Sequence, residues 1–190
     1  MDHKTYIATV AERGAGKGLF VEIVRRLLRD RTVAMVRFSD PLREIVALLG
    51  KEESRDNIDT VATALRNAFH DDGILIPAMR HRLKQTDADI IVLDGLRKPE
   101  EISLVREHNG ILLYITADQH TRFERRRQSA ETTDEIGMSW EQFVRQDQAA
   151  VHTFIRTIGE TMADARIENN GTVEEFEAAI KKFMEDKNIY

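Results

Sequence analysis

The sequence of 190 residues contains no cysteine. Disulfide bonds, thiolate metal sites and thiol nucleophiles are therefore excluded. Long apolar runs are also missing, since none approaches the roughly 18 residues that a membrane span needs, and the N-terminus, M-D-H-K-T, is polar. We therefore expect neither a membrane span nor a signal peptide, and the expected location is cytoplasmic.

An excess of positive charge is absent as well, because the net charge is -5. The chain as a whole has no electrostatic attraction for nucleic acid or anionic membrane, although a local basic cluster can still bind phosphate. A hydrophobic share of 42% beside 32% charged residues indicates a globular protein. We expect one domain, acting on a small molecule as a monomer or homodimer.

The most informative stretch present is A-E-R-G-A-G-K-G, at positions 11–18. It follows an apolar run at 6–10 and opens an amphipathic segment at 17–29. A glycine-rich turn between a strand and a helix exposes backbone N–H groups to an anion, and the helix dipole and a lysine add to the attraction. The residues predicted to bind nucleotide phosphates are Arg13, Gly14, Ala15, Gly16, Lys17, Gly18 and Leu19.

This stretch fits the phosphate-loop pattern G-x-x-x-x-G-K-[ST] with two departures. Ala11 replaces the first glycine, and Gly18 replaces the residue whose hydroxyl normally contacts Mg²⁺. The alternative interpretation is an ordinary glycine-rich turn before a helix. A strand before the turn and a helix after it favour the phosphate loop.

Apolar runs of strand length alternate with segments of helical periodicity along the whole chain. This alternation predicts an α/β fold, a three-layer α/β/α sandwich on a five-stranded parallel sheet. A capping box at Ser139 and Gln142 predicts the start of a long helix reaching Met162, and Thr172 with Glu175 predicts the last helix, with Val173 buried. The expected strands are 6–10, 32–38, 90–93, 110–116 and 165–168; the other expected helices are 17–29, 41–49, 58–69, 73–85 and 99–108.

Charged residues follow several of these strands. Ligands of such sheets bind beyond the carboxyl ends of the strands, so we expect these residues at one edge. Asp94 ends an apolar strand, where a carboxylate can hold Mg²⁺; it can also be a turn aspartate. Arg97 can bind a phosphate with two hydrogen bonds or remain in solvent. Asp40 is either a helix cap or a catalytic group, and Arg43 faces either substrate or water.

The segment 117–138 is polar, so we expect little core from it, and it contains four arginines. Arg122 and Arg126 are four residues apart, on one helical face, where both can meet the same phosphate chain. Arg125 and Arg127 point elsewhere and are as readily solvated. The aromatic residues of a single-strand nucleic-acid platform are not interleaved with them.

Together, A-E-R-G-A-G-K-G, F-S-D-P-L-R-E-I, I-I-V-L-D-G-L-R-K-P-E-E-I and the arginine-rich segment resemble the nucleoside monophosphate kinase branch of P-loop kinases. That branch includes adenylate kinase, deoxynucleoside monophosphate kinase and dephospho-CoA kinase. The resemblance implies a core at 1–38, 86–117 and 138–190, acceptor-binding helices at 39–85 and a lid at 118–137.

The resemblance also implies roles for single residues. Lys17 and the loop glycines would bind the β and γ phosphates of ATP, and Arg43 and Arg97 would bind the acceptor. Arg122 and Arg126 would be lid arginines that close over the transferred group. Catalytic roles are thus expected for Lys17, Asp40, Arg97, Arg122 and Arg126.

The position after G-K-G usually carries a hydroxyl in adenylate kinases but is Leu19 here, so Mg²⁺ would rest on phosphate oxygens, water and Asp94 or Asp40. The predicted function is ATP- and Mg²⁺-dependent phosphoryl transfer to a nucleotide-like small molecule. Transfer to a hydroxyl, as in dephospho-CoA kinases, would need Asp40 as a base. The sequence also permits a nucleotide-binding switch without an acceptor, or an ATPase stimulated by nucleic acid.

Overall fold

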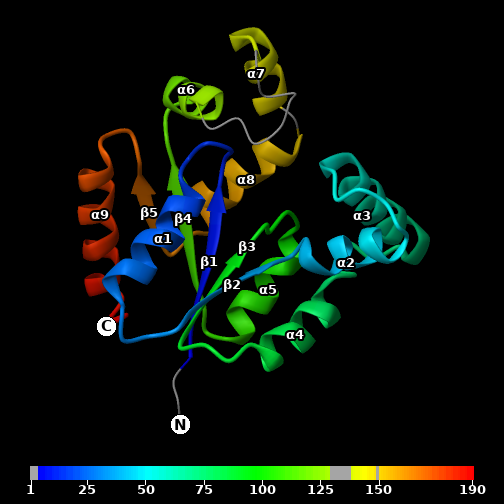
Figure 1. The fold of residues 1–190 in the computed structure, drawn as a ribbon, viewed down its shortest axis with the longest axis horizontal. Coiled ribbons are helices and arrows are strands. Elements are labelled where there is room, and N and C mark those ends of the chain that lie inside the picture. Colours follow the sequence, from blue (N-terminus) through cyan, green and yellow to red (C-terminus); the bar gives the residue numbers. More distant parts are fainter. Residues whose placement is uncertain (1–3, 129–137, 149) are drawn as a thin grey trace. The chain divides into compact units, whose positions relative to one another are not determined.

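The computed structural model describes residues 4–128, 138–148 and 150–190. Its five strands form one parallel sheet in the order β2-β3-β1-β4-β5, flanked by helices, which confirms the predicted α/β fold (Figure 1). The strands are β1 (Thr5–Ala11), β2 (Val33–Arg37), β3 (Ile90–Asp94), β4 (Ile111–Thr116) and β5 (Ala165–Glu168). The helices are α1 (Lys17–Leu27), α2 (Asp40–Leu48), α3 (Arg55–Phe69), α4 (Ile76–Gln85), α5 (Pro99–Glu107), α6 (Gln119–Gln128), α7 (Trp140–Asp147), α8 (Ala150–Thr161) and α9 (Val173–Asp186).

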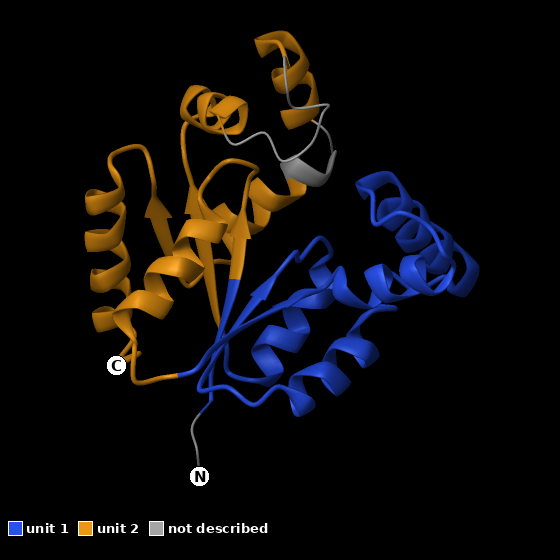
Figure 2. Cartoon of the chain, viewed as in Figure 1, with its two compact units in different colours: residues 1–8, 32–110 blue, residues 9–31, 111–190 orange. Residues whose placement is uncertain are grey.

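The chain divides into two compact units, coloured separately in Figure 2. Unit 1 comprises Met1–Ala8 and Thr32–Gly110, and unit 2 comprises Thr9–Arg31 and Ile111–Tyr190. The predicted division into core, acceptor-binding helices and lid stays a prediction. No helix in the described part of the chain combines the length and apolarity needed to cross a membrane.

Unit 1 is built on the parallel pair β2 and β3, which runs in register from Val33 opposite Ile90 to Arg37 opposite Asp94. All five residues of β3 are buried, as expected of an interior strand with apolar residues on both faces. Helix α2 packs on α3, and α4 packs on α5. The last residue of β3 is therefore a carboxylate at the end of a buried strand.

Unit 2 is built on the parallel pair β4 and β5, with α8 packed on β4 and α9 packed on both β5 and α1. The inward face of α9 is formed by Phe176, Ile180 and Phe183, in agreement with the predicted helical period. The prediction that Val173 is buried is wrong, because 46% of it is exposed. It lies in the first turn, immediately after the cap Thr172, which accepts a hydrogen bond from Glu175 N.

Two expectations about the segment after β4 also need correction. The predicted single helix through Met162 is two helices, because α7 ends at Asp147, whose carboxylate binds side chains of α6 and α8. The polar segment also contributes more to packing than expected. Phe123 of α6 is 8% exposed and packs edge-on against Trp140 and at a tilt against Phe143, with ring centroids 5.4 and 5.5 Å away.

Candidate functional site

The loop predicted to bind phosphates, called the phosphate loop below, connects the end of β1 at Ala11 to the start of α1 at Lys17. Gly14 and Gly16 have φ angles of 79° and 108°, in the left-handed region that L side chains rarely adopt. The Ala15 N–H donates to Glu12 O at 3.2 Å and tightens the turn. The backbone conformation thus explains the glycines at these two positions, and the loop leads directly into a helix N-terminus, which favours an anion.

Two segments of unit 2 pack against this loop. A Cβ on Gly14 would lie 2.6 Å from the carbonyl oxygen of Arg122, so the backbone of α6 approaches the loop closely. A Cβ on Gly16 would collide with the side-chain amide of Asn169. A larger residue at either position would displace one of these neighbours.

Asn169 is a site residue that the sequence did not reveal. It is 3% exposed, and its Nδ2 donates to Ala15 O at 2.9 Å, which ties the loop after β5 to the phosphate loop. Arg125 holds it in turn, donating to Asn169 O at 2.7 Å. In the sequence, Asn169 belongs to the turn N-N-G directly after the last strand. Nothing in that turn indicates a contact with Ala15, which lies far away in the chain.

A buried polar pair anchors the beginning of the loop to β4. The Tyr114 hydroxyl donates to Glu12 Oε1 at 2.8 Å, and both residues are at most 3% exposed. Burial and the hydrogen bond to Glu12 raise the pKa of Tyr114 to about 12, so the hydroxyl remains a donor at neutral pH. Glu12 Oε2 has no hydrogen-bond partner within the described ranges.

Three of the α6 arginines, Arg122, Arg125 and Arg126, have partners within the protein. Arg122 is 3% exposed, and its two terminal nitrogens donate to the Asp147 carboxylate at 2.6 and 2.8 Å while Nε donates to Ala117 O. Arg126, predicted to share a helical face with Arg122 toward a phosphate chain, is buried as Arg122 is. Arg125, predicted to point elsewhere, binds Asn169. The remainder of the predicted lid, 129–137, lies outside the described residues, and the lid role stays a prediction.

Asp147 is the second residue that sequence analysis missed. Besides Arg122, its carboxylate accepts hydrogen bonds from Gln119 at 2.9 Å and Arg156 at 3.2 Å. Burial acts to raise the pKa of Asp147, but the hydrogen bonds and charge of Arg122, with smaller contributions from Gln119 and Arg156, hold it below its ordinary value. The carboxylate is therefore ionised and binds helices α6, α7 and α8 together.

Unit 1 contains the predicted carboxylates. Asp94 is 9% exposed at the end of β3, and its backbone carbonyl accepts from Phe38 N at 2.9 Å. Asp40 is the first residue of α2, and its Oδ2 accepts from the Arg37 N–H at 2.8 Å, closing the turn after β2. Its expected alternative use as the helix cap is wrong, because the cap position is Ser39.

The predicted acceptor arginines also lie in unit 1, and each is paired with a carboxylate. Arg43 donates to Glu53 at 3.1 Å, and Arg97 donates to Asp59 at 3.4 Å. All four side chains are at least 37% exposed, so these pairs contribute little to stability and can exchange for another anion.

The predicted site residues thus divide between the units. Unit 2 contains the phosphate loop and the α6 arginines, and unit 1 contains Asp40, Arg43, Asp94 and Arg97. Their meeting at one edge of the sheet stays a prediction. In the described ranges, no three His, Asp or Glu side chains come together as a metal site, and the role of Asp94 toward Mg²⁺ stays a prediction.

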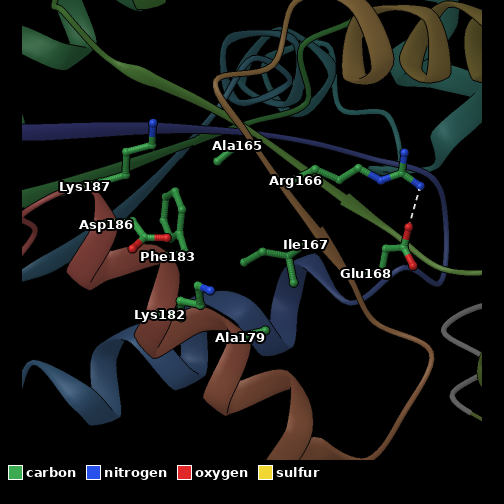
Figure 3. A pocket seen from close by; sticks show the side chains of 9 residues that line it. All are labelled: Ala165, Arg166, Ile167, Glu168, Ala179, Lys182, Phe183, Asp186 and Lys187. Atoms are coloured by element: carbon green, nitrogen blue, oxygen red, sulfur yellow. Dashed lines mark hydrogen bonds and ion pairs between the residues drawn. The ribbon is translucent and has the colours of Figure 1, made fainter.

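A separate hollow lies between β5 and α9 (Figure 3). Its lining mixes apolar side chains such as Ile167 and Phe183 with charged ones, and Arg166 pairs with Glu168, two residues further along β5, at 2.7 Å. None of the predicted site residues belongs to this lining. The hollow therefore has no part in the predicted phosphate chemistry.

No family model matches the chain. In sequence it is similar to UPF0200 protein TK1334 of Thermococcus kodakarensis, with 27% identity over 180 residues that cover 91% of this chain and 92% of that protein. It is also similar to UPF0200 protein Ta0179 of Thermoplasma acidophilum, with 29% identity over 176 residues and 92% coverage of both. Neither name states an activity.

Among solved structures, the chain is similar to shikimate kinase from Bacteroides thetaiotaomicron, with a TM-score of 0.59, 13% identity and coverage of 97% of this chain and 98% of that one. Shikimate kinase from Acinetobacter baumannii in complex with shikimate gives a TM-score of 0.57 at 16% identity, over 100% and 97% of the chains. The chain therefore has the fold of P-loop kinases. Membership of the nucleoside monophosphate kinase branch stays a prediction.

Proposed function

We propose that this protein is an ATP- and Mg²⁺-dependent phosphotransferase that moves the γ-phosphoryl group of ATP to a nucleotide-like small molecule, with a nucleoside or deoxynucleoside monophosphate favoured. The supporting observation is the phosphate loop, in which Gly14 and Gly16 adopt positive φ angles immediately before Lys17 opens α1. Backbone N–H groups, helix dipole and lysine are together suited to the outer phosphates of a nucleotide.

In this proposal, the residues of the chain position and neutralise the phosphates. Lys17 would bind the β and γ phosphates, and Arg122 and Arg126 would stabilise the charge on the transferred group. Arg122 would first have to exchange its bonds to Asp147 for bonds to phosphate. Mg²⁺, when bound, would neutralise charge on the phosphate oxygens, and Asp94 would hold it directly or through water.

Asp40 distinguishes the two acceptor classes. A hydroxyl acceptor needs a base to take its proton, whereas a phosphate acceptor is already ionised and needs only positioning. Asp40 Oδ2 accepts a hydrogen bond from the Arg37 N–H, so one of its two carboxylate oxygens is already engaged in the turn after β2. This contact, together with the exposed guanidinium groups of Arg43 and Arg97, supports a phosphate acceptor. The hydroxyl acceptor remains the second candidate, and shikimate belongs in the test because two structural neighbours are shikimate kinases.

A combined screen tests the proposal. Thermal shift and coupled ADP release are measured with ATP and Mg²⁺ over AMP, CMP, UMP, the deoxynucleoside monophosphates, dephospho-CoA and shikimate. A true acceptor should raise the melting temperature and also turn over. Saturable ATP binding without product would favour the nucleotide-dependent switch, and ATP hydrolysis stimulated by oligonucleotides and lost at high salt would favour the nucleic-acid ATPase.

Asp94→Asn should change the metal requirement. The amide keeps the shape of the side chain but removes the negative charge that would hold Mg²⁺, so we expect half-maximal activity to need roughly ten-fold more Mg²⁺. The measurement is the initial rate against Mg²⁺ concentration at saturating ATP. Asp87→Asn, at an exposed position in the turn before β3, is the matched control. An unchanged Mg²⁺ profile in Asp94→Asn would remove this carboxylate from the site.

Asn169→Ala should weaken nucleotide binding. It removes the hydrogen bond to Ala15 O that holds the phosphate loop, and losing a buried hydrogen bond costs about 1 kcal/mol, or about a five-fold weaker Kd for ATP. Isothermal titration with a non-hydrolysable ATP analogue provides the measurement. Asn170→Ala is the control, because Asn170 is exposed and accepts from Asp118 N instead. Equal affinities in the two variants would show that Asn169 does not support the loop.

A further inference from the structure

Glu101 is a buried charged residue to which neither the sequence motifs nor the proposed mechanism assigns a role. It is the third residue of α5 and only 1% exposed. Directly before this helix lies the loop that contains Arg97, the predicted acceptor arginine. Burying a carboxylate costs several kcal/mol unless its surroundings compensate, so its contacts need an explanation.

The contacts of Glu101 reach in two directions. Its Oε2 accepts hydrogen bonds from the backbone N–H of Arg97 at 2.6 Å and of Lys98 at 3.2 Å. Its Oε1 accepts from the guanidinium of Arg66 on α3 at 3.3 Å. Burial raises the pKa of Glu101, while these three groups act in the opposite direction. The carboxylate thus binds the Arg97 loop to α5 and to α3.

Helix capping alone does not account for this arrangement. A glutamate at the third helical position ordinarily binds the N–H of the cap residue, which here is Lys98. The shorter of the two backbone hydrogen bonds goes instead to Arg97, one residue before the cap. Lys98 has no acceptor group in its side chain with which to complete a reciprocal box. The stronger bond therefore fixes the backbone of Arg97.

We infer that Glu101 is the positioning residue of the acceptor site, holding the backbone of Arg97 so that its guanidinium can bind the anionic group of the acceptor. This inference rests on the proposed function. The main chain and the side chain of Arg97 have different partners. The buried carboxylate of Glu101 binds the main-chain N–H of Arg97, and its guanidinium contacts the exposed Asp59 at 3.4 Å. An incoming phosphate would exchange with Asp59 at the guanidinium while the main chain stays in place.

Kinetics of Glu101→Ala and Glu101→Gln test the inference. We expect the KM for the acceptor to rise about ten-fold in Glu101→Ala, with kcat and the KM for ATP within about two-fold, because one misplaced binding group affects one substrate. Glu101→Gln retains one oxygen acceptor and should be intermediate. Glu100→Gln removes the same charge from an exposed neighbour in the same turn and should match the wild type. Equal changes in the KM of both substrates, or an unchanged acceptor KM, would overturn the inference.

A second measurement needs no turnover and separates this inference from the proposed function. Inorganic phosphate is titrated into each protein, and binding is followed by NMR at the Arg97 amide. We expect the wild type and Glu100→Gln to bind phosphate and Glu101→Gln to bind it several-fold more weakly. Because glutamine keeps the size of the side chain, Glu101→Gln still tests the inference if Glu101→Ala does not fold. Absent binding in the wild type, or equal binding in Glu101→Gln, would overturn the inference. A wild type that binds phosphate but transfers none to any acceptor would refute the proposed function alone.

Discussion

Replacing Lys17 with methionine is expected to abolish phosphoryl transfer and leave the fold intact. Lys17 is the first residue of α1, directly after Gly16, and it is half-buried at the loop. Methionine preserves much of the length and the apolar stem of the side chain. It removes the positive charge that directly follows Gly16 in the phosphate loop. Loss of one preorganised group that stabilises charge in a transition state lowers kcat by about 100-fold to 1,000-fold, so we expect a decrease of at least this size.

The measurement is steady-state ADP release with the acceptor identified in the screen, together with thermal unfolding of each variant. Lys182→Met is the matched control, because Lys182 is an exposed lysine on α9 in the same unit and lines the hollow of Figure 3. The control should retain full turnover. Undiminished turnover in Lys17→Met would refute the assignment of a catalytic phosphate loop.

Asp147→Asn is expected to destabilise unit 2 strongly. Asparagine has nearly the same shape, but it removes the charge that Arg122 and Arg156 bind, and the guanidinium of Arg122, 3% exposed, loses the carboxylate to which it donates hydrogen bonds. Removing one partner of a buried ion pair costs about 3–5 kcal/mol. We therefore expect the free energy of unfolding at pH 7 to decrease by that amount, measured by chemical denaturation.

The pH dependence of this loss has a definite sign. The pKa of Asp147 is lowered in the folded protein, so the folded state favours the ionised carboxylate. Its stabilisation is fully present above the unfolded pKa of about 3.9 and is lost as the pH falls through the lower folded pKa. The difference between wild type and Asp147→Asn should therefore be largest near neutral pH and shrink in acid.

Glu168→Gln provides the comparison for this prediction. Glu168 pairs with Arg166 at 2.7 Å, but both side chains are more than half exposed, so its loss should cost no more than about 1 kcal/mol. A loss of similar size in Asp147→Asn would show that Arg122 finds another partner. In that case, phosphate would not have to compete with Asp147 for the guanidinium of Arg122.

The elements of the fold could be predicted closely because their signals are local. The run at 90–93 is apolar at every position, which is typical of a strand buried on both faces, and β3 is such a strand. Thr172 and Glu175 predict the beginning of α9 because the two groups of a capping box lie three residues apart. The glycines of the phosphate loop are equally local, since their φ angles follow from the turn itself.

The end of α7 shows where such signals fail. Apolar periodicity continues from α7 into α8, so the pattern predicts one helix. In the structure α7 ends at Asp147, and a second helix, α8, begins at Ala150. The sequence gives no reason to expect Asp147 to be buried, and its partner Arg122 lies 25 residues away. A pattern of neighbouring residues contains no information about such a pair, because the pair forms only when separate helices pack.

The sequence by itself therefore determined the strands, the helices other than the division between α7 and α8, the α/β class and the glycine turn after β1, because backbone conformation, periodicity and capping depend on residues close together in the chain. Only the tertiary structure decided that Arg122 is bound to Asp147, that Asn169 holds Ala15 O, and that Glu101 turns its carboxylate to the backbone of Arg97. Buried polar groups must find partners wherever the packed elements bring them. Those partners are set by the fold as a whole.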